Sequence, residues 1–217
     1  MSSHTMELPR KIVVGEKNIA NIGNFLKSLK STKKVSLISG SNVKKIVQKK
    51  IQKHFDLAKI ENIWYLAKTN DTKSIRDIEK KVSQNKSDLI IGIGGGRSVD
   101  IAKMIGFNLA LPFVSVPTSA SHDGIASPFV SIKGDKPHSL VTTAPLGVFV
   151  DVDIMKRAPK KLLASGCGDL IAKITAVRDW QLSRDKTGEY YGRYSADLAL
   201  MSAKILMESS ERFSKKG

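Results

Sequence analysis

The chain has 217 residues, a formal net charge of +16 and a composition that is 41% hydrophobic and 26% charged. These values fit one large globular domain, or one domain with part of another, and provide enough apolar residues for a core. No apolar run is long enough to span a membrane, and the first eleven residues lack the apolar core of a signal peptide. A single cysteine, Cys167, excludes an internal disulfide framework and is typical of a reducing compartment, so we expect a cytoplasmic protein.

The positive charge is concentrated in the first 86 residues, which hold 19 Lys and Arg against 7 Asp and Glu. A specific nucleic-acid site would need aromatic residues or a recognition motif among these charges, and neither is found. We therefore expect solvated basic helix faces and no specific nucleic-acid partner. Nonspecific attraction to polyanions remains open.

Short apolar runs alternate with amphipathic helical patterns along the first 150 residues. Strands are predicted at 11–15, 35–39, 62–67, 87–94, 112–119 and 147–151. Helices are predicted at 18–29, 41–55, 71–85 and 98–110, with Ser41 as an N-cap of the second. This β-α alternation predicts an α/β fold with a Rossmann-like, mostly parallel sheet and ligands at the carboxyl ends of its strands.

The pattern changes after Ser127, where a β-hairpin is predicted around Gly134–Asp135, and only helices are predicted from Pro159 onward. We expect a dinucleotide-binding α/β domain at 1–156 and the start of a helical metal and substrate domain at 157–217. The second segment is too small to enclose a core by itself, so we expect this domain to be incomplete.

Three consecutive glycines separate a predicted strand from a predicted helix in "LIIGIGGGRSVDIAK" (89–103). Glycine lets the main chain approach a bulky anion, and the first turn of a helix attracts phosphate. The run therefore predicts a phosphate cradle. The alternative is a tight turn without a ligand. The run departs from the dinucleotide fingerprint because Arg97 holds the place of the third glycine.

Two further segments contain candidate functional residues: "VPTSASHDGIASPF" (116–129), rich in hydroxyls, and "SGCGDLIAK" (165–173). Asp123 precedes Gly124, so the alternative interpretation is that it is an ordinary turn residue. Asp169 lies in a predicted helix, so the alternative is that it is a solvated surface residue. Glycine inside a helix costs about 1 kcal/mol, so Gly166 and Gly168 indicate close approach of another group.

The order and amino-acid sequences of these three segments resemble those of the superfamily of glycerol dehydrogenases, iron-containing alcohol dehydrogenases and dehydroquinate synthases. The resemblance runs from about Arg10 to the end of the chain. Within the superfamily, "PTSASHDGIASP" (117–128) is most similar to the archaeal sn-glycerol-1-phosphate dehydrogenases. Glycerol dehydrogenases tend to carry Asp-Ala where this chain has Asp123-Gly124, and dehydroquinate synthases differ there.

This resemblance implies NAD(P)H-dependent reduction of dihydroxyacetone phosphate to sn-glycerol 1-phosphate for archaeal membrane phospholipids, assisted by zinc. It implies that the dinucleotide is bound by Gly95, Gly96, Arg97, Ser98, Val99, Thr118, Ser119, Ala120, Ser121 and Ser127. Asp123 and Asp169 would contact the substrate as catalytic residues, and Asp169 would also ligate the metal. The alternatives are a nucleotide-binding fragment without turnover and an enzyme like glycerol dehydrogenase or dehydroquinate synthase.

The resemblance implies two more metal ligands, histidines from a later helical region, but no histidine follows Asp169 in this chain. His122 is a weaker candidate for a metal ligand, and the alternative interpretation is that it is an ordinary surface histidine. The sequence leaves open whether the chain forms a homo-oligomer.

The cofactor preference is predicted from the residues that follow the strand 35–39. NAD-selective folds place a carboxylate there, whereas this chain has Gly40, Ser41 and Asn42, with Lys44 and Lys45 close by. We expect NADPH to bind at least as well as NADH.

Overall fold

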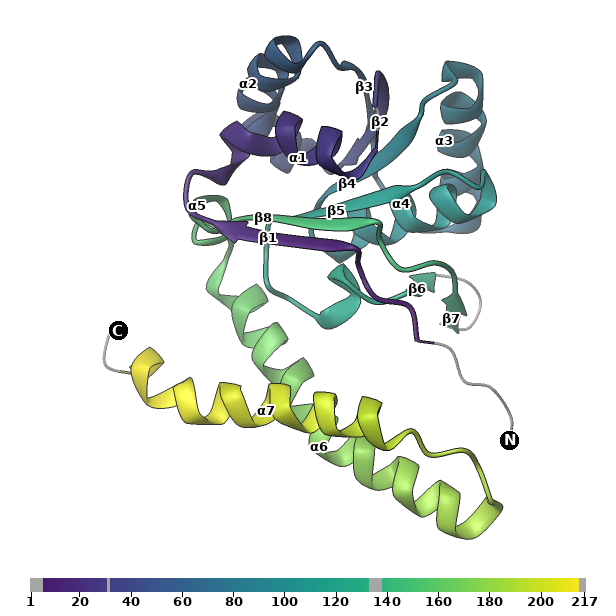
Figure 1. Ribbon diagram of the computed structural model, residues 1–217, viewed down its shortest axis with the longest axis vertical. Helices are drawn as coiled ribbons and strands as arrows, with labels where there is room; N and C mark the ends of the chain where they lie inside the picture. The colour runs from purple at the N-terminus through teal and green to yellow at the C-terminus, as the bar shows by residue number, and fades with distance from the viewer. Residues whose placement is uncertain (1–5, 31, 133–137, 215–217) are drawn as a thin grey trace. The chain divides into compact units, whose positions relative to one another are not determined.

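The computed structural model describes residues 6–30, 32–132 and 138–214 (Figure 1). It contains two compact units. The first comprises Met1–Ala120 and Gly124–Ala158, and the second comprises Ser121–Asp123 and Pro159–Gly217. Within the described ranges, no helix is both long and apolar enough to cross a lipid bilayer.

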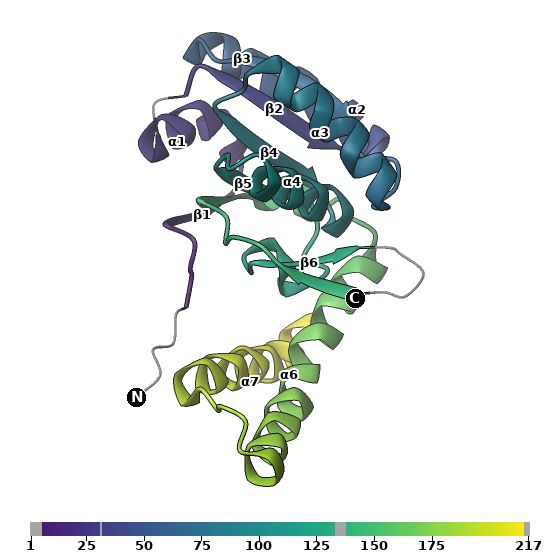
Figure 2. The same ribbon diagram turned by 90° about the vertical axis from the view of Figure 1, so that its right-hand side faces the viewer.

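The first unit is built on a six-stranded parallel sheet with the order β1-β8-β5-β4-β2-β3 (Figures 1 and 2). Its strands are β1 (Lys11–Gly15), β2 (Lys34–Ser39), β3 (Glu61–Leu66), β4 (Leu89–Gly94), β5 (Phe113–Pro117) and β8 (Gly147–Asp151). All six predicted strands are present, and the predicted fold class is confirmed.

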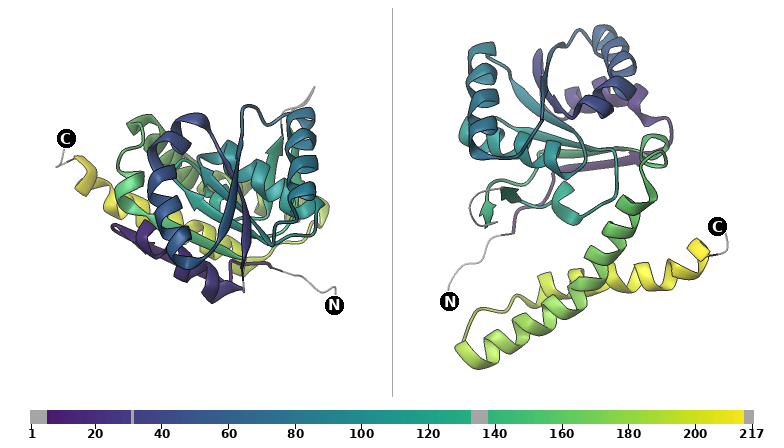
Figure 3. Two further views of the ribbon diagram at one scale, coloured as in Figure 1. Left: turned by 90° about the horizontal axis from the view of Figure 1, so that it is seen from above. Right: turned by 180° about the vertical axis from the view of Figure 1, so that it is seen from behind.

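Helices cover both faces of this sheet, as Figure 3 shows from above and from behind. One face carries η1 (Asn18–Asn21), α1 (Ile22–Leu29) and α2 (Ser41–Ala58), and the other carries α3 (Thr72–Asn85) and α4 (Gly96–Asn108). Leu37 packs in the first of the two cores and its neighbour Ile38 in the second, and the same holds for Ile91 and Ile90. Because successive side chains of a strand point to opposite faces, a sheet covered on both faces needs the continuous apolar runs seen in the sequence.

The expectation that Ser41 caps α2 is wrong. The N-cap is Gly40, which is extended (φ −70°, ψ 153°) and makes no side-chain cap hydrogen bond, and Ser41 is already helical. By contrast, Asp71 caps α3 by accepting a hydrogen bond of 2.9 Å from the main-chain N–H of Ser74. Hydrogen bonds from the Thr69 hydroxyl and from Ser74 hold the pKa of Asp71 below its usual range, because they stabilise its carboxylate form.

An antiparallel hairpin of β6 (Phe129–Ile132) and β7 (His138–Val141) follows β5. Its strands confirm the predicted hairpin, whose turn at Gly134–Asp135 lies outside the described residues. Val130 and Ile132 are buried in the same core as α4. The short helix α5 (Val152–Met155) follows β8 and ends the ordered elements of the first unit.

The second unit consists of two helices that pack on each other, α6 (Lys160–Thr187) and α7 (Arg193–Ser214). Gly188 ends α6 in the left-handed region (φ 73°), and the indole N–H of Trp180 donates to the carbonyl of Tyr190 at 2.7 Å. Val177 is buried, whereas Leu182 and Met201 are about half exposed. The two helices therefore enclose little apolar surface by themselves.

Candidate functional site

The glycine run lies at the carboxyl edge of the sheet, between β4 and α4. Gly95 is the N-cap of α4 and Gly96 its first residue, and the helix has neither a side-chain cap nor an acidic residue in its first turn. The N–H groups of a first helical turn and the helix dipole attract anions. Open α/β sheets bind ligands at this edge. The local geometry is therefore that of an anion site.

The glycines of this run differ in what the fold demands of them. A Cβ on Gly92 would lie 2.8 Å from Cβ of Ala102, and one on Gly94 would lie 2.8 Å from the Ser98 hydroxyl at a φ of +148°. Gly95 has ordinary extended geometry (φ −80°), and a Cβ there would meet only the Ser119 hydroxyl, at 3.5 Å. Packing requires a glycine at 92, and main-chain geometry requires one at 94. The requirement at Gly94 is what the alternative of a tight turn without a ligand predicts. They do not require Gly95.

Only some main-chain N–H groups in the first turn of α4 are available to an anion. The N–H groups of Ser98 and Val99 donate to the carbonyl of Gly95, at 3.0 and 3.3 Å. Both side chains are buried. The N–H groups of Gly96 and Arg97 are therefore the better placed donors among the predicted cradle residues.

A pocket of about 410 Å³ lies next to the cradle, where the helices after β2 and β4 leave on opposite faces of the sheet. In the order β5-β4-β2-β3, the chain continues from β4 toward β5 and from β2 toward β3, in opposite directions along the sheet. The point between two such strands is the usual ligand site of an open α/β sheet. The lining residues are Gly40, Ser41, Asn42, Val43, Leu66, Ala67, Lys68 and Arg97. Arg97 donates a hydrogen bond of 2.7 Å to the carbonyl of Lys68. The lining holds two cationic side chains and no carboxylate.

The structure brings part of the hydroxyl-rich segment to the cradle. The N–H of Thr118 donates to the carbonyl of Gly94 at 3.0 Å, and the neighbouring Ser119 is 2% exposed. Ala120 is exposed, and Ser127 is half-buried beyond the short helix η2 (Asp123–Ile125). Within the described part of the chain, no hydrogen bond joins Ser127 to the cradle. Thr118 and Ser119 are therefore the hydroxyl residues placed next to the glycines, while Ser121 falls in the second unit.

The second unit brings the two predicted acidic residues together. The main-chain N–H of Asp123 donates to Oδ2 of Asp169 at 2.9 Å, and Lys173 Nζ lies 2.5 Å from Oδ2 of Asp123. Asp169 and Lys173 are four residues apart on α6, so they share one helix face. The sequence interpretation missed Lys173, although its spacing from Asp169 was a signal that could have found it.

The described residues do not complete a metal site. No group of three or more His, Cys, Asp or Glu side chains in the described ranges is arranged to hold a metal ion. A catalytic zinc needs three protein ligands and an open position. Gly168 lies inside α6 rather than at its end, and beyond its chain neighbours and the nearby backbone of α6, a Cβ there would meet no atom of the described chain within 4 Å. The close approach expected at this glycine is not made by the described residues.

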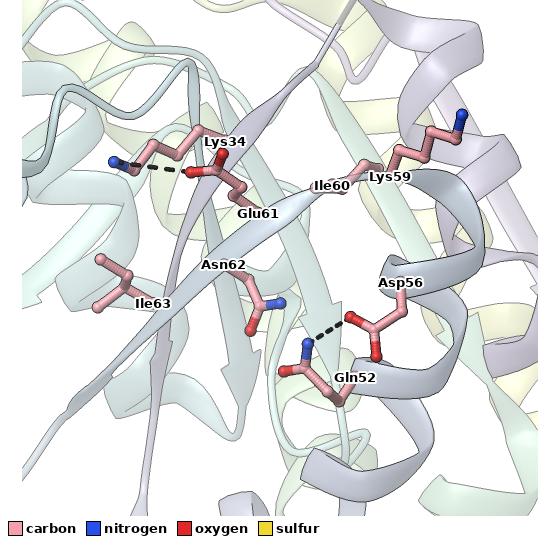
Figure 4. A pocket seen from close by; sticks show the side chains of 8 residues that line it. All are labelled: Lys34, Gln52, Asp56, Lys59, Ile60, Glu61, Asn62 and Ile63. Atoms are coloured by element: carbon pink, nitrogen blue, oxygen red, sulfur yellow. Dashed lines mark hydrogen bonds and ion pairs between the residues drawn. The ribbon is translucent and has the colours of Figure 1, made fainter.

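A further pocket lies at the opposite edge of the sheet, beside the first residues of β3 (Figure 4). It measures about 650 Å³ and contains the hydrogen bond from the Gln52 amide to Asp56 (2.7 Å) and the ion pair of Lys34 with Glu61 (3.9 Å). Its position at the amino ends of the strands is the wrong edge for a dinucleotide in this class of sheet.

Comparisons with known proteins identify the family and support the fold. The family model for iron-containing alcohol dehydrogenase matches residues 13–159. The glycerol-1-phosphate dehydrogenases [NAD(P)+] of Nitrosopumilus maritimus and Cenarchaeum symbiosum are 61% and 59% identical to the whole chain. The crystal structure of a probable glycerol dehydrogenase from Sinorhizobium meliloti aligns with a TM-score of 0.82 at 20% identity, covering 96% of this chain and 58% of that one.

The segments 89–103, 116–129 and 165–173 predicted a resemblance to this group of dehydrogenases, and the comparisons confirm it. The chain spans 61% of the length of the two archaeal relatives. The family match covers most of the first unit, including the cradle and the hydroxyl-rich segment. This chain therefore belongs to the iron-containing alcohol dehydrogenase family.

Proposed function

We propose that the first unit binds a nicotinamide dinucleotide, NADH or NADPH, at the carboxyl edge of its sheet. The observation that carries this proposal is the open cradle at Gly95, which the fold itself does not require to be glycine. The pyrophosphate would be held by the N–H groups of Gly96 and Arg97 at the start of α4. Thr118 and Ser119 would supply hydroxyls beside it.

We further propose that the chain provides the cofactor-binding part of an enzyme that reduces dihydroxyacetone phosphate to sn-glycerol 1-phosphate in the cytoplasm. The names of the archaeal relatives give glycerol 1-phosphate and NAD(P)+, and dihydroxyacetone phosphate is the ketone that corresponds to this alcohol. When bound, the reduced nicotinamide supplies the hydride that converts the C2 ketone to the secondary alcohol.

Asp123 and Asp169 are proposed to contact the substrate. Lys173 next to Asp123 offsets one negative charge, which favours the approach of a phosphate dianion to this acidic pair. Asp169 is proposed as one metal ligand, but the described residues do not complete a zinc site, so we assign no step of the reaction to a metal. We propose that 157–217 is the start of the helical substrate domain.

The test is a titration of the purified chain with NADH and NADPH, followed by an assay of cofactor oxidation with dihydroxyacetone phosphate. We expect tight binding with negligible oxidation by this chain, whose described residues hold no complete metal site, and oxidation once a helical region with two histidines is added. Tight binding without oxidation even in that extended protein supports the alternative of a nucleotide-binding fragment. Oxidation that requires dihydroxyacetone in place of its phosphate favours a glycerol dehydrogenase-like enzyme, and the absence of any dinucleotide binding overturns the proposal.

A further inference from the structure

Lys103 is a fully buried lysine in the second half of α4, with none of its surface exposed. A buried ammonium is costly unless it is hydrogen-bonded. Its Nζ donates to the carbonyl of Gly124 at 2.8 Å and to the carbonyl of Phe129 at 2.7 Å. Both acceptors are main-chain groups of the segment that follows β5, so this one side chain joins the helix of the cradle to that segment.

The part of the hydroxyl-rich segment from Thr118 to Ser127 is therefore anchored on both sides to β4 and α4. At its start, the N–H of Thr118 donates to the carbonyl of Gly94, which ends β4. Towards and beyond its end, Lys103 holds Gly124 and Phe129. Between these anchors lie turns, bends and the three-residue η2 rather than strand or long helix, so few main-chain hydrogen bonds fix their position. Side-chain anchors must contribute most of the order.

We propose that Lys103 is a positioning residue for the dinucleotide site: it holds Gly124 and Phe129 against α4, so that Thr118 and Ser119, earlier in the same connection, keep their place beside Gly95. This inference rests on the proposed cofactor binding. An ammonium suits the task because it offers three donors, and hydrogen bonds from a charged donor are stronger than neutral ones. A methionine at this position would fill similar space but leave the carbonyls of Gly124 and Phe129 without this donor.

The test compares Lys103→Met with Ile105→Ala, which removes apolar contacts of a fully buried residue on the same helix. The side chain of Ile105 has no hydrogen-bond donor, so this control removes no hydrogen bond to either carbonyl. The Kd for NADH and for NADPH is measured by fluorescence titration, and amide hydrogen exchange is followed over 118–129. We expect Lys103→Met to raise both Kd values at least tenfold and to speed exchange in this segment. We expect Ile105→Ala to stay within twofold of the wild-type Kd even where its loss of Tm is as large.

Affinity losses that follow the loss of Tm equally in both variants would mean that Lys103 acts only through stability. A folded Lys103→Met protein with wild-type affinity and wild-type exchange would also overturn the proposal. If Lys103→Met does not fold, Lys103→Gln takes its place, because its amide can still donate to one carbonyl, and an intermediate Kd is then expected. If the wild-type chain binds neither cofactor, the proposed function fails, while the exchange measurement still tests the anchor.

Discussion

The main-chain N–H of Asp123 donates a hydrogen bond of 2.9 Å to the carboxylate of Asp169, across 46 positions of sequence. Because a main-chain group is the donor, the contact does not depend on the side chain at 123, proline excepted because it has no N–H, but it is lost when the side-chain oxygens at 169 are removed. The side chain of Asp123 is left to pair with Lys173. The structure thus separates the two acidic residues: Asp169 positions the turn, and Asp123 carries the exposed charge.

The first prediction concerns the metal. A single carboxylate cannot hold zinc tightly, because the ion takes several ligands in tetrahedral geometry. We expect the 217-residue chain to bind no stoichiometric zinc and to turn over negligibly. Adding a helical region with two histidines is expected to restore both, and Asp169→Asn should then remove both again. Metal analysis of the purified chain is the measurement, and one tightly held zinc per chain together with reductase activity would show the ligand assignment to be wrong.

The second prediction uses the unequal glycines of the cradle. Gly95→Val should abolish NADH binding while the protein stays folded, because the added side chain occupies the approach of the pyrophosphate and its Cβ meets only the Ser119 hydroxyl, at 3.5 Å. Gly94→Ala should instead unfold at a clearly lower temperature, because its φ of +148° and the Ser98 hydroxyl leave no room for a Cβ. Thermal unfolding and fluorescence titration of both variants check this. A folded Gly95→Val protein that binds NADH normally would exclude the cradle.

The third prediction concerns the choice of cofactor. The pocket beside the cradle has Lys68 and Arg97 in its lining and no carboxylate, so nothing there repels a 2′-phosphate. We expect NADPH to bind at least as well as NADH. Ser41→Asp should weaken NADPH binding about tenfold, or ~1.4 kcal/mol, relative to NADH, and Ser41→Asn serves as the uncharged control. A tenfold preference of the wild-type chain for NADH would contradict this expectation.

The fourth prediction concerns stability in acid. The carboxylate of Asp88 accepts hydrogen bonds of 2.9 Å from the main-chain N–H groups of Lys33 and Lys34, which hold the pKa of Asp88 below its usual range. Because the pKa of Asp88 is lower in the folded than in the unfolded protein, its carboxylate stabilises the fold fully at pH values above the unfolded-state pKa, about 3.9. This contribution is lost as the pH falls through the folded-state pKa. Asp88→Asn should therefore lower the free energy of unfolding at pH 7 and matter less and less below about pH 4.

Urea unfolding at pH 7 and at pH 3 measures this difference for Asp88→Asn and for the control Asp77→Asn, an exposed carboxylate on α3. The control should change little at either pH. An Asp88→Asn variant as stable as the wild type at pH 7 would show that the negative charge of Asp88 contributes nothing to folding, because the asparagine amide oxygen can still accept both hydrogen bonds.

The sequence by itself determined the strands, the main helices and the β-α alternation, because side-chain periodicity reports how each segment is buried. The run from Leu89 to Gly94 is apolar throughout, and all of it is buried at the centre of the parallel sheet. The glycine run and the hydroxyl-rich segment also pointed to the carboxyl edge of the sheet, since both follow predicted strands. Ser41 was misjudged because its role depended on the main-chain conformation of Gly40, which periodicity does not report.

Tertiary structure alone decided what each of these residues does. Three adjacent glycines look equivalent in a sequence, yet the packing of Ser98 forces one of them and leaves Gly95 unconstrained. Lys103 reads as one surface lysine among many until β6 and the preceding turn cover it, and Lys173 gains its meaning only when a turn near position 123 meets α6. The contacts of Lys103 and Lys173 join residues 20 or more positions apart, and their geometry follows from the order in which strands and helices pack, not from any local pattern. Gly94 and Ser98 are near neighbours in the sequence, but the φ of +148° that brings them together arises where β4 ends and α4 begins, which side-chain periodicity does not report.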